Sequence, residues 1–179
     1  MSRTMRTALV GFCDVLFESG PTPQRTKVYV WPDLRETHDF AICNQGIAKQ
    51  ELKDKFECEF DWDMSECHKE WDYPPFTTDE AVARAERVRL RLKQLSDSAP
   101  ETCENIFLVT HRGFISFLVQ GERFDSCECR SYRFATEQQV NEETRYGINP
   151  DSGLRQDYGP TVLLPASPVQ LETKTNSVT

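Results

Sequence analysis

The stretch NIFLVTHRGFISFL, residues 105–118, constrains the fold of this chain more than any other. Apolar residues fill positions 106–109, as in a short buried strand, and a helical pattern begins near Gly113. His111 lies in the turn between them, at the carboxyl end of the predicted strand, which is where ligands bind in open parallel sheets. A lone histidine there is either a polar residue satisfied within the turn or part of a binding site.

Helical and extended patterns alternate along the chain, which favours one α/β domain over residues 1–164 with a mainly parallel, layered sheet. Neither an internal repeat nor a second core is visible in the sequence. We expect helices from Arg3 to before Gly20, over 47–56, from Thr77 to about Ser98, and over 113–119. We expect strands over 27–31, 105–109, 129–135 and 161–165, and a disordered tail over 165–179, which lacks apolar content.

Two local patterns have both a functional and a structural interpretation. The three tryptophans lie in or near an acidic, irregular segment at 57–76, and they form either a ligand platform or pins that hold a long loop; we favour pins. A basic run on the predicted third helix alternates with core positions, so we expect a solvated helix face. Its members are Arg84, Arg87, Arg89, Arg91 and Lys93.

Composition argues against several classes of protein. The net charge of −8 opposes binding to nucleic acid or to an anionic membrane. No apolar run approaches the ~18 residues of a membrane span, and Asp14 interrupts the apolar N-terminal stretch, so we expect an amphipathic helix there instead of a signal peptide. Seven cysteines with scattered spacing favour reduced thiols and a cytoplasmic location. None has the paired C-x-x-C spacing of a structural zinc site, so we expect no metal.

Residues that suit a phosphate site accompany His111. Glu36 follows a short predicted strand, and Arg3 stands at the start of a helix whose first amide groups attract anions. A guanidinium fork and an imidazole bind phosphate oxygens, and a carboxyl group can protonate a leaving alcohol. The sequence alone does not show that these groups meet.

Four segments, in this order, resemble the histidine phosphatase superfamily, which has the phosphoglycerate-mutase-like fold, and in particular its fungal branch. SRTMRTA is similar to the end of the family's S-P-x-x-R-x-x-x-T-A segment, and LRETHDFAICNQG is similar to L-x-E-x-x-x-x-x-C-D-T-G. LVTHRGF is similar to the T-H-G-G-F segment, and CECRSYRF to the N-x-E-Y-R-S-Y-x-F strand. The resemblance spans roughly residues 1–135.

The resemblance implies phosphoryl transfer from a small phosphomonoester through a covalent phosphohistidine, as a phosphatase or a phosphomutase, with no cofactor. It implies that Arg3 and His111 bind the phosphate and that Glu36 is the catalytic proton donor. Arg112 stands where the family has glycine, and it either adds phosphate affinity or crowds the pocket. The implied partner is a small phosphorylated metabolite, with the acidic 57–76 segment at the rim of the site.

The chain departs from the family pattern at its nucleophile. The family's phosphorylated histidine lies in an R-H-G motif on the first strand, and none of His38, His68 and His111 is in such a motif. We therefore expect an N-terminally truncated fold that lacks the usual first strand, exposes unpaired backbone and apolar surface, and transfers phosphoryl groups poorly. The alternative is an inactive relative that binds phosphate or a protein partner.

Overall fold

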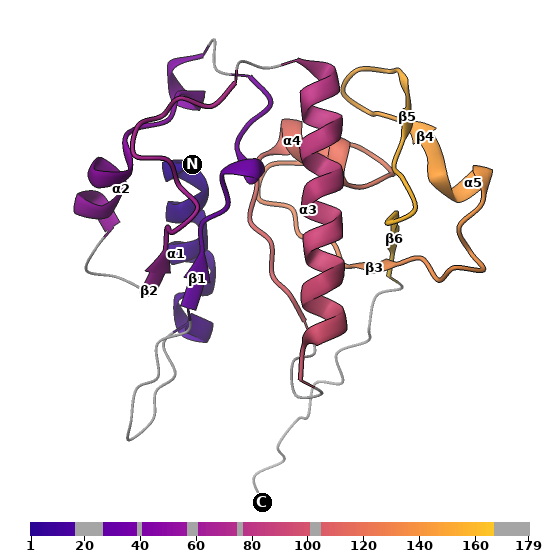
Figure 1. Cartoon of the computed structure of the whole chain (residues 1–179), viewed down its shortest axis with the longest axis horizontal. Coiled ribbons are helices and arrows are strands. Elements are labelled where there is room, and N and C mark those ends of the chain that lie inside the picture. The colour runs from indigo at the N-terminus through magenta and orange to yellow at the C-terminus, as the bar shows by residue number, and fades with distance from the viewer. Residues whose placement is uncertain (17–26, 39–40, 57–60, 75–76, 101–104, 167–179) are drawn as a thin grey trace, which may run out of the picture.

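The computed structural model describes residues 1–16, 27–38, 41–56, 61–74, 77–100 and 105–166. In Figure 1 one long helix, α3, runs through the middle, with α1, α2, β1 and β2 on one side and the remaining strands on the other. The helices are α1 (Ser2–Leu16), α2 (Lys49–Phe56), α3 (Thr78–Ser98), α4 (Arg112–Leu118) and α5 (Glu142–Arg145), with 3-10 turns η1 (Pro32–Leu34) and η2 (Ile42–Asn44). The strands are β1 (Lys27–Tyr29), β2 (Asp61–Asp63), β3 (Tyr132–Phe134), β4 (Tyr146–Ile148), β5 (Arg155–Asp157) and β6 (Leu163–Pro165).

The four predicted helices are present, as α1 to α4. Thr77 caps α3, because its hydroxyl oxygen accepts a hydrogen bond of 3.1 Å from the backbone N–H of Glu80. Ala85, Val88 and Leu92 on the apolar face of α3 are buried, and Val82 at its start is half-buried. Leu95 is 41% exposed because the helix continues past the core. The structure describes no residue beyond 166, so nearly all of the predicted tail lies outside the described residues.

The predicted layered, mainly parallel sheet is wrong for the described residues. They form three separate two-stranded sheets: β1 and β2 are parallel, whereas the pairs β3–β6 and β4–β5 are antiparallel. The predicted strand at 105–109 belongs to no sheet, and Ile106 and Phe107 are 43% and 63% exposed. An extended segment becomes a strand only where a neighbour satisfies its backbone groups, and no described segment pairs with this one.

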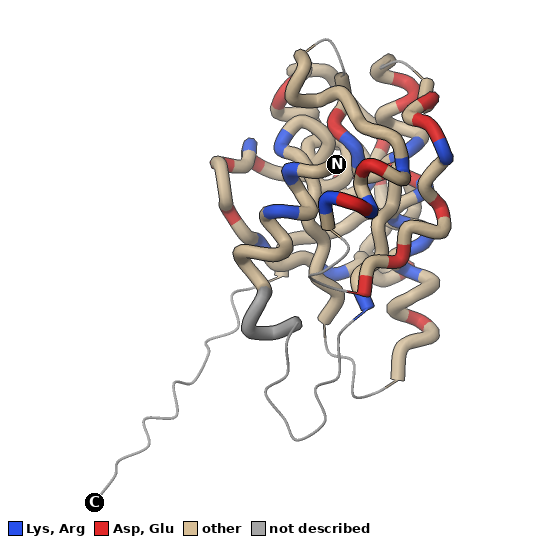
Figure 2. Tube along the Cα trace, turned by 90° about the vertical axis from the view of Figure 1, so that its left-hand side faces the viewer, with Lys and Arg blue, Asp and Glu red and all other residues tan. Residues whose placement is uncertain are grey.

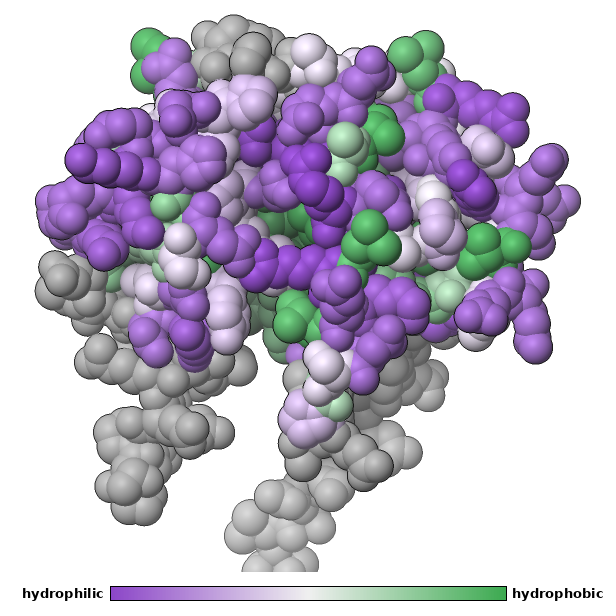
Figure 3. All heavy atoms as spheres, viewed as in Figure 1, coloured by the Kyte–Doolittle hydropathy of each residue, from purple (hydrophilic) through white to green (hydrophobic). Residues whose placement is uncertain are grey.

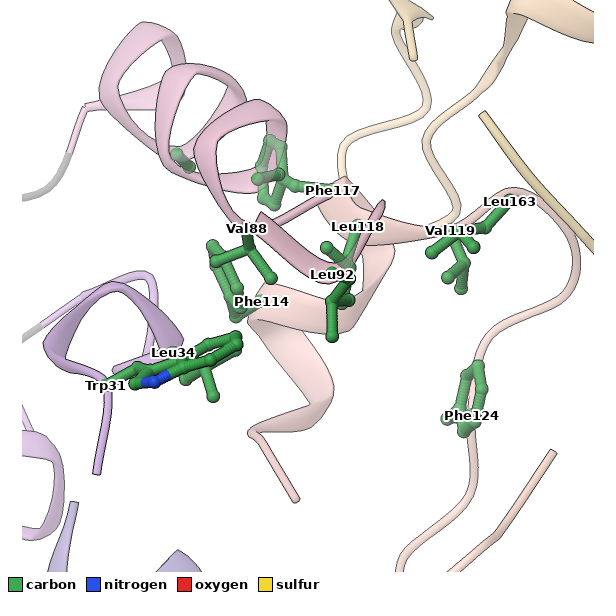
Figure 4. Close-up of a cluster of buried hydrophobic side chains, with 12 residues drawn as sticks. Trp31, Leu34, Val88, Leu92, Phe114, Phe117, Leu118, Val119, Phe124 and Leu163 are labelled. Carbon is green, nitrogen blue, oxygen red and sulfur yellow. The ribbon is translucent and has the colours of Figure 1, made fainter. Parts of the chain in front are cut away.

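Buried hydrophobic side chains form two clusters, although the sequence showed no second core. The larger cluster joins η1, α3 and α4, and Figure 4 shows Val88 and Leu92 of α3 facing Phe114 and Leu118 of α4. The smaller cluster joins α1, α2 and the residues around β1 and β2. Its members are Met1, Met5, Val30, Leu52, Phe56, Met64 and Cys67.

The predicted solvated face of α3 is wrong for two of its arginines. Arg84 and Arg89 are only 2% and 0% exposed. Arg89 donates hydrogen bonds of 2.9 and 3.1 Å to the carbonyl oxygens of Phe117 and Leu118, which end α4. The last carbonyl groups of a helix lack partners within the helix, so a buried guanidinium satisfies them and fixes the end of α4.

The β4–β5 hairpin completes the anchoring of α4. The Asn149 side-chain amide and the Tyr158 hydroxyl both donate to the carbonyl oxygen of Ser116, at 3.2 and 3.1 Å. Gln156 donates to the Phe117 carbonyl oxygen at 2.8 Å. Three buried side chains from one hairpin thus hold the last turn of α4, whose first turn follows His111.

Two of the three tryptophans act as structural pins. The indole N–H of Trp62 donates to the Phe56 carbonyl oxygen at 3.1 Å, and the ring of Trp71 lies so close to Gly46 that a Cβ there would overlap it.

Lys and Arg are interspersed with Asp and Glu along the trace in Figure 2. No helix of the described part is long and apolar enough to cross a membrane.

Candidate functional site

His111 lies at the N-cap of α4 in a buried position, with 7% of its surface exposed. Its Nε2 atom is fully buried and has no hydrogen-bond partner among the described residues. Burial lowers the pKa of the imidazole from 6.5 to about 3, and positive charges on the Met1 amino group, Arg3 and Arg84 act in the same direction. The ring is therefore neutral near pH 7, and one of its nitrogens has no partner in the described part of the chain.

Glu36 faces His111 from the segment that follows η1. Its Oε2 atom lies 3.8 Å from His111 Nδ1, and its Oε1 atom accepts a hydrogen bond of 2.9 Å from the backbone N–H of Thr37. Gly113 permits this approach, because a Cβ there would lie 2.5 Å from Glu36 Oε1. The glycine of the T-H-R-G turn thus has a steric role beside the carboxyl group.

Arg84 of α3 positions the segment that carries Glu36. Its guanidinium donates to the carbonyl oxygens of Asp33, Arg35 and Glu36 at 3.3, 3.0 and 3.3 Å. The Thr110 hydroxyl donates to the Leu34 carbonyl oxygen at 2.9 Å, which ties the same segment to the residue before His111. Sequence reasoning missed both residues, because their partners are backbone carbonyl groups of a distant segment that leave no side-chain pattern.

Arg3 reaches the same region from the first turn of α1. Its guanidinium donates to Asn44 Oδ1, and the Asn44 amide nitrogen lies 3.1 Å from His38 Nδ1. The charge of Arg3 also acts on His111, as the pKa of that imidazole shows. Glu36 and His111 therefore face each other, whereas Arg3 contacts Asn44 and lies near enough for its charge to act on the imidazole.

Arg112 is placed differently from the other three predicted site residues. Its side chain is exposed and lies at the surface near Ile115, Glu122 and Phe124. In the described part of the chain it forms no hydrogen bond or ion pair with Arg3, Glu36 or His111.

The space beside this cluster is narrow. A cavity of about 20 Å³ lies among Glu36, Thr37, His38, Asn44 and Arg84, together with neighbouring side chains, and it has room for about one water molecule. Neither Arg3 nor His111 lines this cavity, and it is too small for a phosphate group in this structure. The described residues contain no group of three or more histidine, cysteine or acidic side chains that could hold a metal ion.

No protein-family model, curated protein or solved structure was found to match this chain. The resemblance to histidine phosphatases thus rests on the four sequence segments alone.

Proposed function

We propose that Arg3, Glu36 and His111 bind the phosphoryl group of a small phosphomonoester, and that the protein is a phosphoglycerate-mutase-like member of the histidine phosphatase superfamily. The observation that carries the proposal is the approach of Glu36 to His111, with a positive charge from Arg3 acting on the imidazole. His111 Nδ1 lies 3.8 Å from Glu36 Oε2, and the charge of Arg3 acts on the same imidazole. These are the side-chain types that phosphoryl transfer to histidine requires around a tetrahedral anion.

The charges around His111 favour the binding of an anion together with a proton on the imidazole. Nearby cations lower the pKa of His111 in the free protein, and a phosphate dianion beside the ring offsets their charge. The imidazolium form then becomes more favourable and donates a hydrogen bond to the phosphate. We therefore expect the pKa of His111 to be higher in the phosphate-bound protein than in the free protein.

We propose that phosphoryl transfer is impaired, because the R-H-G motif of the family is missing from this sequence. His38 contacts Asn44, and His68 pairs with Asp72 at 2.7 Å, so each has a partner of its own. In this proposal Arg3 and His111 hold the phosphate, and Glu36 protonates the leaving oxygen in any residual turnover.

The test measures the binding of inorganic phosphate and vanadate by calorimetry, and the turnover of p-nitrophenyl phosphate. Arg3→Met should weaken anion binding at least about tenfold, because a charge-assisted hydrogen bond contributes about 1.5–3 kcal/mol. Arg6→Met, which removes an exposed arginine one turn along the same helix, is the matched control and should bind normally.

Turnover separates the two forms of the proposal. Slow hydrolysis that is lost in His111→Ala supports a weakened enzyme, whereas anion binding without hydrolysis supports an inactive phosphate-binding relative. Equal anion binding by the unmodified protein and Arg3→Met, or hydrolysis that survives His111→Ala, would show that the site is assigned wrongly.

A further inference from the structure

A second cavity, of about 320 Å³, lies between η1, α3 and the segment around Glu66–Tyr73. This volume is at the lower end of the range for small-molecule sites, which is about 300–1,000 Å³. Trp31, Pro32 and Val88 supply its apolar lining. Figure 3 shows this face hollowed beside α3, with hydrophobic atoms inside the hollow and hydrophilic side chains around it. The cavity does not contain Arg3 or His111, so its use is independent of the proposed phosphate site.

Flat groups dominate the wall of the cavity. The Arg91 guanidinium carbon lies 3.8 Å from the centre of the Trp31 ring system, and the rings of His68 and Tyr73 stack with centroids 4.4 Å apart. Planar guanidinium and aromatic groups bind planar ligands by stacking, and base–aromatic stacking contributes about 1–3 kcal/mol per ring. The shape of the wall therefore selects a planar ligand.

The charges around the cavity cancel in pairs. Arg87 binds both carboxylate oxygens of Asp33, at 2.9 and 3.0 Å, and Arg91 binds both carboxylate oxygens of Glu66. Because each guanidinium already has a counter-ion, the wall has no excess charge to attract an anion or a cation. It offers hydrogen-bond donors and acceptors side by side, which suits a neutral ligand with both kinds of group on its edge.

One residue of the wall has a buried donor without an acceptor. Trp31 is 7% exposed, and its indole N–H is buried without a hydrogen-bond partner among the described residues. Trp62, by contrast, donates to a backbone carbonyl oxygen. A buried donor without a partner is rare and costly in native proteins, and a ligand that displaces the atoms covering this N–H and offers an acceptor removes that cost.

We propose that this cavity binds a neutral, planar heteroaromatic molecule of nucleoside size. Its ring lies among Trp31, Tyr73 and Arg91, and one of its edge acceptors takes the hydrogen bond from the Trp31 indole. Purine nucleosides have this chemistry, since their rings are planar and uncharged and carry donors and acceptors on their edges.

The test is a titration of the full chain with adenosine and with guanosine, followed by the indole N–H signals in proton–nitrogen NMR spectra. Trp31→Phe identifies the Trp31 signal, and Trp62 serves as an internal reference. We expect one nucleoside or both to move the Trp31 signal saturably downfield, as a new hydrogen bond requires, and to leave the Trp62 signal in place. Ribose alone should move neither signal.

Two variants and one further probe complete the test. Arg91→Ala should weaken nucleoside binding about tenfold, because it removes the stacked cation. Arg123→Ala, which breaks an exposed pair with Asp151 at 2.7 Å, is the matched control and should bind normally. The proposal is overturned if neither nucleoside moves the Trp31 signal, if Arg91→Ala binds as well as the control, or if benzoate binds and the nucleosides do not.

Discussion

Replacing His111 by glutamine should make the folded protein less sensitive to acid. His111 is buried, and its pKa falls from 6.5 to about 3 in the folded state. As the pH drops below 6.5, the imidazole takes up a proton in the unfolded chain but stays neutral in the folded one, so protonation favours unfolding. The stability that depends on neutral His111 is complete above pH 6.5 and is lost progressively until the pH reaches about 3.

The size of this loss of stability follows from the shift in the pKa of His111. Each pH unit between the two pKa values costs about 1.4 kcal/mol, so a change from pH 7 to pH 5 should cost about 2 kcal/mol through His111 alone. Domains of this size are stable by about 5–15 kcal/mol, so a loss of this size is a large fraction of the total. Glutamine has no titrating group, so the His111→Gln variant should not lose this part of its unfolding free energy in acid.

Urea unfolding at both pH values, for the unmodified protein and His111→Gln, measures the effect. The fall in unfolding free energy from pH 7 to pH 5 should be about 2 kcal/mol smaller in the variant. Val88→Ala, which removes buried methyl groups from the larger cluster, is the control and should lose stability equally at both pH values. An equal acid loss in His111→Gln and the unmodified protein would refute the account of a buried, neutral imidazole.

Three further predictions concern side chains around the cluster and α4. Arg84→Met should lower the unfolding free energy by about 3 kcal/mol, because three carbonyl oxygens lose their donor, and should raise the pKa of His111 in an NMR titration, because a nearby positive charge is gone. Gly113→Ala should leave the melting temperature nearly unchanged, since alanine favours a helix, but should displace Glu36 and shift the His111 ring signals. Asn149→Ala should cost about 2–4 kcal/mol in urea unfolding, because Asn149 is 1% exposed and its side chain bonds to both the α4 end and its own turn.

Local patterns predicted the helices well. In α3, the cap at Thr77 and the apolar spacing that follows are properties of neighbouring residues, so the sequence shows where the helix begins and which face it buries. The pairing of strands could not be predicted in the same way, because it depends on residues that are far apart in the sequence. Residues 105–109 have the composition of a strand, but a strand also needs a partner, and its sequence does not reveal whether one is present.

The candidate site was predicted in part. The residue types of Arg3, Glu36 and His111 suggested a phosphate site, and the structure places Glu36 beside His111, whereas Arg3 contacts Asn44. The phosphate site itself stays a prediction. Arg84 looked like a surface residue, because a guanidinium that binds backbone carbonyl groups has no complementary side chain in the sequence. The spacing of its neighbours on α3 gave one usable signal, since Arg84 falls on the same helical face as Ala81, Ala85 and Val88, which are all buried.

The most direct test of the proposed phosphate site is an NMR titration of the His111 ring nitrogens with inorganic phosphate. The proposed site predicts a saturable shift toward the imidazolium form, with binding that is weakened at least about tenfold by Arg3→Met but not by Arg6→Met. Ring signals that do not respond to phosphate, or that respond equally in all three proteins, would contradict it.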